Sequence, residues 1–171
     1  MSTSETQLEP TMNAQPQKEH QWLQRLVGEW TYESTATMGP DAPPMNCDGT
    51  ESVRTLGGLW VLCEGHFEMA GGGPDTTLMS LGFDPDKKRF VGTFIGSMMT
   101  YLWVYDGELD QAGRVLTLNA EGPDFSVPGK MAKYKDVIEI KDDDHRVLSS
   151  QFLADDGTWH GFMTANYRRK K

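Results

Sequence analysis

From Glu29 to Tyr167 the apolar residues recur mainly at every second position, as in β-strands that bury one face. Turn residues such as Gly57-Gly58 and Asp84-Pro85-Asp86 interrupt this alternation at intervals of about 8 to 12 residues. The pattern predicts ten strands, over residues 29–36, 49–56, 59–69, 76–83, 89–95, 99–105, 115–121, 133–141, 147–153 and 158–167.

A different spacing precedes the strands. Trp22, Leu23, Leu26 and Val27 fall at i, i+1, i+4 and i+5, which predicts a helix over residues 19–27 that ends at Gly28. A helix of this length is unstable alone in water, so we expect its apolar stripe to pack on the rest of the domain. Residues 1–18 are polar and predict a disordered leader, and residues 19–171 predict a single domain.

No helical pattern separates one strand from the next, so neighbouring strands should pair antiparallel. An open sheet of ten strands would expose two edges, and closure removes them. We therefore predict an all-β, up-and-down antiparallel barrel with a short N-terminal helix at one open end and a Pro-rich loop, residues 39–44, as a flap beside it. A β-sandwich is the alternative.

Charge and composition narrow the classes of partner. The 171 residues carry 16 Lys plus Arg and 25 Asp plus Glu, a net charge of -9. This charge repels phosphate backbones and anionic lipids, so we expect neither nucleic acid nor membrane as a partner. The basic residues 168–171 are interpreted as a solvated chain end.

The sequence contains no apolar segment long enough to cross a bilayer and no secretory signal. Cys47 falls in a Pro-rich loop and Cys63 in an apolar strand, which favours free thiols in a reducing cytoplasm over one disulfide. The sequence therefore predicts a cytoplasmic protein.

The strands expected over 89–95 and 99–105 provide the candidate binding site. A two-residue turn at Ser97-Met98 would place Phe90, Gly92, Phe94 and Gly96 on the same face as the aromatic residues of the next strand. Small glycines opposite large rings would leave room for a ligand, although the same rings could instead fill the core. The ligand-binding candidates are Phe94, Met99, Tyr101, Trp103 and Tyr105.

Histidines offer two further hypotheses, each with a simpler alternative. His66 and Glu64 could act as a general base and its partner if they face inward, but the alternation favours a solvated outer face. His160 could be an axial haem ligand, although a lone surface histidine is the simpler interpretation. The Cys and His spacings match no metal site, and the sequence predicts no cofactor.

Gly28-Glu29-Trp30 after a short helix resembles the G-x-W motif that opens lipocalins and their calycin relatives. In that group an Arg of the last strand packs over the Trp, a part that Arg168 or Arg169 would take here. The resemblance therefore implies structural roles for Gly28, Trp30 and one of these arginines.

A longer pattern is similar to an uncharacterised bacterial family of calycin-like barrels, described only as a domain of unknown function. The motifs that carry it are Leu26-Val27-Gly28-x-Trp30, Leu56-Gly57-Gly58, Leu81-Gly82-Phe83-Asp84 with Lys87-Lys88, Ser97-Met98 and Tyr167-x-Arg169. Gly96 and Thr164 stand where that family often has acidic residues, so no role for those carboxylates transfers. The resemblance implies a fold and no activity.

These observations favour binding of a small hydrophobic or aromatic molecule inside the barrel. One alternative is an enzyme acting on a small apolar substrate there, with His66 and Glu64 or Tyr101 moving protons. Another is a filled barrel whose outer face forms a homodimer.

Overall fold

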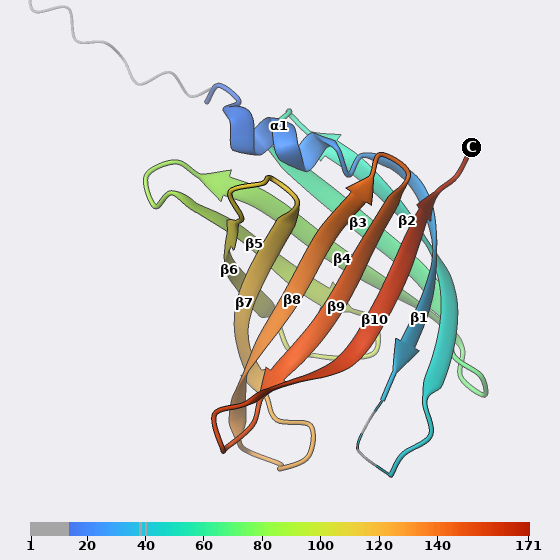
Figure 1. Ribbon diagram of the computed structural model, residues 1–171. Coiled ribbons are helices and arrows are strands. Elements are labelled where there is room, and N and C mark those ends of the chain that lie inside the picture. The colour runs from blue at the N-terminus through green and yellow to red at the C-terminus, as the bar shows by residue number, and fades with distance from the viewer. Residues whose placement is uncertain (1–13, 38, 40) are drawn as a thin grey trace, which may run out of the picture.

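The alternating segments form ten antiparallel strands that close into one barrel, with a short helix across one end (Figure 1). The computed structural model describes residues 14–37, 39 and 41–171. The elements are α1 (Lys18–Gln24), β1 (Gly28–Ala36), β2 (Met45–Leu56), β3 (Trp60–Glu68), β4 (Pro74–Asp84), β5 (Arg89–Gly96), β6 (Trp103–Leu109), β7 (Val115–Pro123), β8 (Met131–Asp142), β9 (His145–Leu153) and β10 (Trp159–Arg169).

Each strand pairs with its neighbours in sequence, and β1 pairs with β10 to close the ring. In this closing pair Trp30 lies opposite Arg169 and Ala36 opposite Met163. The predicted up-and-down barrel is therefore confirmed over the sandwich. Closure pairs every strand on both sides, which removes the exposed edges that an open sheet would have.

The helix is slightly shorter than predicted. After Gln24 the chain tightens, because the amides of Arg25, Leu26 and Val27 bond to carbonyls three residues earlier, at 3.0–3.1 Å. Helix α1 is held to the barrel by Trp22 Nε1, which donates to the carbonyl of Gly113 at 2.7 Å. Its buried side chains, Trp22 and Leu23, enter the barrel core, as the apolar stripe predicted.

Strand β6 begins four residues later than predicted. The chain after β5 stays bonded to β4 through the amide of Ser97, which donates to the carbonyl of Thr76 at 2.8 Å. Residues 97–102 therefore form a wider loop than the predicted two-residue turn, and Phe94 faces Trp103 in place of Tyr101. Because the register moves by two residues, every side chain keeps its predicted face.

The Pro-rich segment connects β1 to β2 at the end of the barrel away from α1, so the expectation that it lies beside the helix is wrong (Figure 1). Strand β2 already begins at Met45, so the connection is shorter than the sequence suggested. Within it, Met38 and Pro40 lie outside the described residues, as do residues 1–13 of the expected leader. No helix in the described residues is long and apolar enough to cross a membrane.

Candidate functional site

The helix end of the barrel is closed around Trp30, which is 2% exposed. Its Nε1 donates to the carbonyl of Leu26 at 2.9 Å, and the guanidinium carbons of Arg169 and Arg146 lie 4.3 and 4.7 Å from its ring. Arg169 also donates to the carbonyl of Val27 at 2.6 Å, so it ties the last strand to the helix–strand corner. Arg168, paired with Thr31, is exposed.

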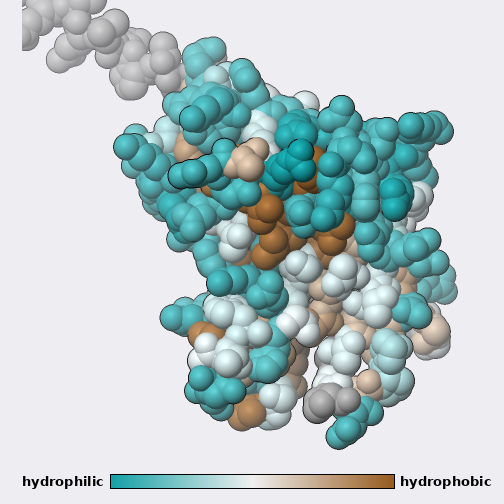
Figure 2. Space-filling model, viewed as in Figure 1, coloured by the Kyte–Doolittle hydropathy of each residue, from teal (hydrophilic) through white to brown (hydrophobic). Residues whose placement is uncertain are grey.

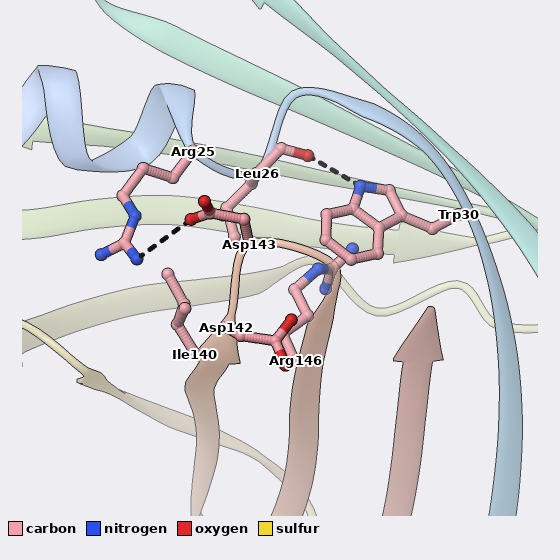
Figure 3. Close-up of a pocket in the computed structure, with 7 residues that line it drawn as sticks. All are labelled: Arg25, Leu26, Trp30, Ile140, Asp142, Asp143 and Arg146. Carbon is pink, nitrogen blue, oxygen red and sulfur yellow. Dashed lines mark hydrogen bonds and ion pairs between the residues drawn. The ribbon is translucent and has the colours of Figure 1, made fainter. Parts of the chain in front are cut away.

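A narrow pocket remains at this closed end, between α1 and the β8–β9 turn (Figure 3). Arg25 points across it toward Asp143, and Trp30 and Arg146 form its inner wall. Its volume is about 10 Å³, which is room for about one water molecule. A ligand of ordinary size cannot enter the barrel from this end.

Beside this end lies a larger surface depression of about 540 Å³, lined by Asp142, Asp143, Asp144, His145, Arg168, Arg169 and Lys171. Three of its charged residues pair with one another, since Asp144 meets Lys171 at 3.1 Å and Arg169 at 3.5 Å. Ligand sites are mostly apolar and concave, and this depression is neither closed nor apolar. The candidate site therefore lies inside the barrel.

On six of the ten strands, inward-facing side chains lose burial with distance from the helix. On β1, Trp30 is buried while Tyr32 and Ser34 are partly exposed; on β2, Val53 and Glu51 are buried and Cys47 is partly exposed. The same change occurs on β3 between Cys63 and Phe67, on β4 between Met79 and Thr77, on β5 between Gly92 and Phe94, and on β10 between Ala165 and Met163. On these six strands the inward positions are therefore packed near α1 and partly exposed toward the other end, whereas Trp103, Gly122 and Tyr134 are buried near that end on β6, β7 and β8.

Partial exposure also reaches the middle of the barrel. Leu148 faces inward between buried Arg146 and Ser150, and Ala120 faces inward between buried Leu118 and Gly122, yet both remain partly exposed. Asp136, also on an inward position, is partly exposed as well. We call the space bordered by Tyr32, Phe94, Ala120, Asp136, Leu148 and Met163 the inner cavity. Figure 2 shows that the end away from the helix is divided by projecting loops and is less hydrophilic than the helix end.

A buried ion pair forms one side of the cavity floor. Arg146, which is 4% exposed, donates through Nη2 to Glu51 Oε1, and its guanidinium carbon lies 4.0 Å from the Tyr167 ring. Burial and the charge of Glu51 raise the pKa of Tyr167, so this phenol stays protonated. The Tyr32 ring lies 4.9 Å from that of Tyr167, and burial raises its pKa as well.

A second polar cluster on the floor centres on Asp136. Ser150 Oγ donates to Asp136 Oδ1 at 2.6 Å, and the Tyr105 hydroxyl donates to Oδ2. Burial raises the pKa of Asp136, and these two hydrogen bonds oppose the rise only in part. The described residues place no Lys, Arg or His in an ion pair with this carboxylate, in contrast to Glu51.

Of the five predicted ligand-binding residues, Phe94, Trp103 and Tyr105 lie on β5 and β6, and Met99 and Tyr101 lie in the loop between these strands. Phe94 and Tyr105 face inward, and buried Trp103 lies nearer the open end, where its ring lies 5.1 Å from that of Tyr101. Met99 lies in the β5–β6 loop, and its Sδ accepts from Trp103 Nε1 at 3.2 Å. The aromatic wall continues through Tyr134, Phe125, Phe162 and Phe152.

The glycines of β5 do not leave the room that the sequence suggested. A side chain at Gly92 would collide with the carbonyl oxygen of Ser80, and one at Gly96 would collide with Met98 Sδ. These glycines permit close packing between strands and against the loop.

The two histidine hypotheses have different outcomes. His66 and Glu64 lie on the outer face of β3, with side chains 53% and 54% exposed, so the proposed catalytic pair inside the barrel is wrong. His160 is exposed, stacks on the Phe152 ring at 5.5 Å and forms a hydrogen bond with Thr158. Within the described ranges, no three His, Cys, Asp or Glu side chains form a group that could hold a metal ion.

Sequence reasoning missed the polar floor. Glu51 shares the face of Val53, and Arg146 shares the face of Leu148, so the period-two pattern itself places these charges inward. The signal that could have indicated the polar floor is a charged residue on the apolar face of a strand.

Among solved structures, the crystal structure of Rv2717c from M. tuberculosis is similar, with a TM-score of 0.59 and 15% identity over 92% of this chain and 100% of that one. A de novo designed fluorescence-activating β-barrel has a TM-score of 0.47 and 12% identity, over 86% of this chain and 96% of that one. The first likeness shows a shared barrel fold. No curated protein matches the chain.

One family model matches almost the whole barrel and its helix, over residues 15–169. Its description is "Protein of unknown function (DUF1579)". The chain belongs to this family.

Proposed function

We propose that this protein binds a small molecule with an apolar or aromatic body in the inner cavity, which the ligand enters from the end opposite α1. The observation that carries the proposal is the loss of burial along the inward faces of six strands. A barrel that only needed a packed core would gain stability by filling this space with side chains. The likeness to calycin barrels, which include ligand-holding lipocalins, points in the same direction.

The composition of the wall supports an apolar or aromatic ligand body. Phe94, Leu148 and Met163 offer partly exposed apolar surface inside the barrel, and the rings around Trp103 extend it toward the opening. Burial of this surface by a ligand contributes about 25 cal/mol per Å² of apolar area removed from water. The polar floor would then orient the ligand.

Titration with the neutral apolar dye Nile red tests this proposal, with fluorescence and calorimetry as readouts. Thr77 lies on the inward face of β4, next to β5. Thr77→Trp should therefore fill the inner cavity and weaken binding at least about tenfold, a loss of about 1.4 kcal/mol in binding free energy. Its neighbour Thr76 contacts His66 on the outer face, so Thr76→Trp should bind as the parent does.

Melting curves show whether both variants remain folded. If the parent binds neither Nile red nor any member of a fatty-acid and aromatic library, the proposal is wrong. Equal loss of binding in both variants would also contradict a site inside the barrel.

We also propose a second role, self-association through the outer face of β5 and β6. Val104, Leu102 and Ile95 are 60%, 53% and 46% exposed near the β5–β6 loop, while the ion pairs of Arg89 with Asp106 and Glu108 cover the other end of this face. Sedimentation of the parent and Val104→Lys at several concentrations tests it. A homodimer should dissociate in the variant, and a parent that stays monomeric throughout would contradict the proposal.

The negative charge supports a protein that binds neither nucleic acid nor anionic membranes. Cys47 and Cys63 are both free thiols, which supports a reducing compartment such as the cytoplasm.

A further inference from the structure

We propose that the inner cavity selects an organic cation, an amine or ammonium on an apolar or aromatic body, whose positive group pairs with Asp136. This inference rests on the proposed small-molecule site and adds the chemical class of its ligand.

The first argument is the balance of charge inside the barrel. Glu51 and Asp136 are two carboxylates, and Arg146 is the cation that faces them, already bonded to Glu51. Asp136 has hydrogen bonds from Ser150 and Tyr105 but no counter-ion in the described residues. A buried charge without a partner is costly, so a ligand cation would gain the ion pair that the protein does not supply.

The second argument is access. A carboxylate has about four lone-pair positions, and Asp136 uses one on each oxygen. The residue lies on an inward position and is partly exposed as a whole, and the proposal requires that a ligand in the inner cavity reach its free lone pairs. Ser150 and Tyr105 hold the carboxylate in a fixed orientation for an incoming N–H donor.

The third argument concerns the rest of the wall. Aromatic faces attract cations, and the cavity side near Phe94 and Trp103 is rich in them. The net charge of -9 would raise the rate at which cations arrive and lower that of anions. An anionic ligand would instead add a third negative charge beside a single guanidinium.

Asp136→Asn provides a variant that should fold. The amide can accept from one hydroxyl and donate to the other, since Ser and Tyr hydroxyls do both. The folded protein raises the pKa of Asp136, so the ionised carboxylate costs stability once the pH rises through that pKa. We therefore expect Asp136→Asn to melt at or above the parent temperature at pH 7. The matched control is Glu139→Gln, which removes a carboxylate of the same strand that pairs with Lys141 at 2.9 Å on the outer face.

The test uses three probes that share one ring system: 2-naphthylmethylammonium, the neutral 2-naphthylmethanol and the anionic 2-naphthoate. Calorimetry should give the parent and Glu139→Gln at least about tenfold tighter binding of the ammonium than of the alcohol, with the anion weakest. Asp136→Asn should lose the preference for the ammonium and keep its affinity for the alcohol.

Acid should weaken ammonium binding by the parent as Asp136 takes up a proton, while binding of the alcohol and all binding by Asp136→Asn should change little. The titratable groups that share the barrel interior with Asp136 are Tyr32, Cys47, Glu51, Cys63, Tyr105, Tyr134, Arg146 and Tyr167. These groups titrate in both proteins, so the difference between the pH profiles of the parent and Asp136→Asn reports on Asp136 alone.

The outcomes separate the two proposals. Binding of the alcohol or anion as tight as that of the ammonium overturns the cation class and leaves a small-molecule site standing. An ammonium preference that survives in Asp136→Asn overturns the role of Asp136. If no probe binds the parent, the cation proposal fails, and the Nile red and library titrations decide whether the small-molecule site stands.

Discussion

At the scale of single residues, Trp30 holds more of the fold together than any other side chain at the helix end. Its ring is buried, its Nε1 reaches the last turn before β1, and guanidinium groups from β9 and β10 lie over it. Loss of the ring would leave a cavity and remove the surface on which Arg146 and Arg169 pack.

We predict that Trp30→Ala lowers the free energy of unfolding by about 3 to 5 kcal/mol, measured by urea denaturation. Trp30→Phe keeps most of the apolar surface and loses the hydrogen bond to Leu26, so it should cost less, about 1 to 2 kcal/mol. A Trp30→Ala midpoint equal to that of the parent would show that the ring does not support closure of the barrel.

At the scale of elements, the corner between α1 and β1 depends on Gly28. Its φ of 140° is one that other residues rarely adopt, and an added Cβ would collide with the Arg169 guanidinium that bonds to Val27. The helix can therefore end and the first strand begin within one residue, close to the last strand.

We predict that Gly28→Ala destabilises the protein by about 2 to 4 kcal/mol, because backbone strain adds to a displaced Arg169. Gly157 offers the matched control, since its φ is 83° and an added Cβ would meet nothing within 4 Å. Gly157→Ala should cost only the strain of about 1 kcal/mol. Thermal and urea unfolding of both variants provide the measurement, and equal losses would contradict the role of the Arg169 contact.

The ten strands, their order and the closing pair could be predicted because alternation and turn residues are local signals. The start of β6 could not, since the bond from Ser97 to Thr76 joins residues of different strands. The packing around Gly92 could not be predicted for the same reason. The pattern placed Phe94 and Tyr105 inward, but the space beside Gly92 is filled by the neighbouring strand. Glu51 and Arg146 were readable as inward charges, whereas their pairing across the barrel required the fold.

At the scale of the whole molecule, the barrel has two unlike ends. The helix, Trp30 and the arginines close one end, leaving a pocket of about 10 Å³. Toward the other end the inward faces are partly exposed as far as Asp136 and Leu148. On the proposal made above, the barrel is a container whose polar inward groups select its contents.

The central claim is that the inner cavity is open to solvent in the protein without a ligand. A high-resolution crystal structure of the protein without ligand tests it most directly, through ordered water within the barrel. The account predicts a continuous solvent-filled space that runs from the end opposite α1, past Phe94 and Met163, to a water bonded to Asp136. Density showing Phe94, Leu148 and Met163 packed against one another, with no water at Asp136, would contradict it.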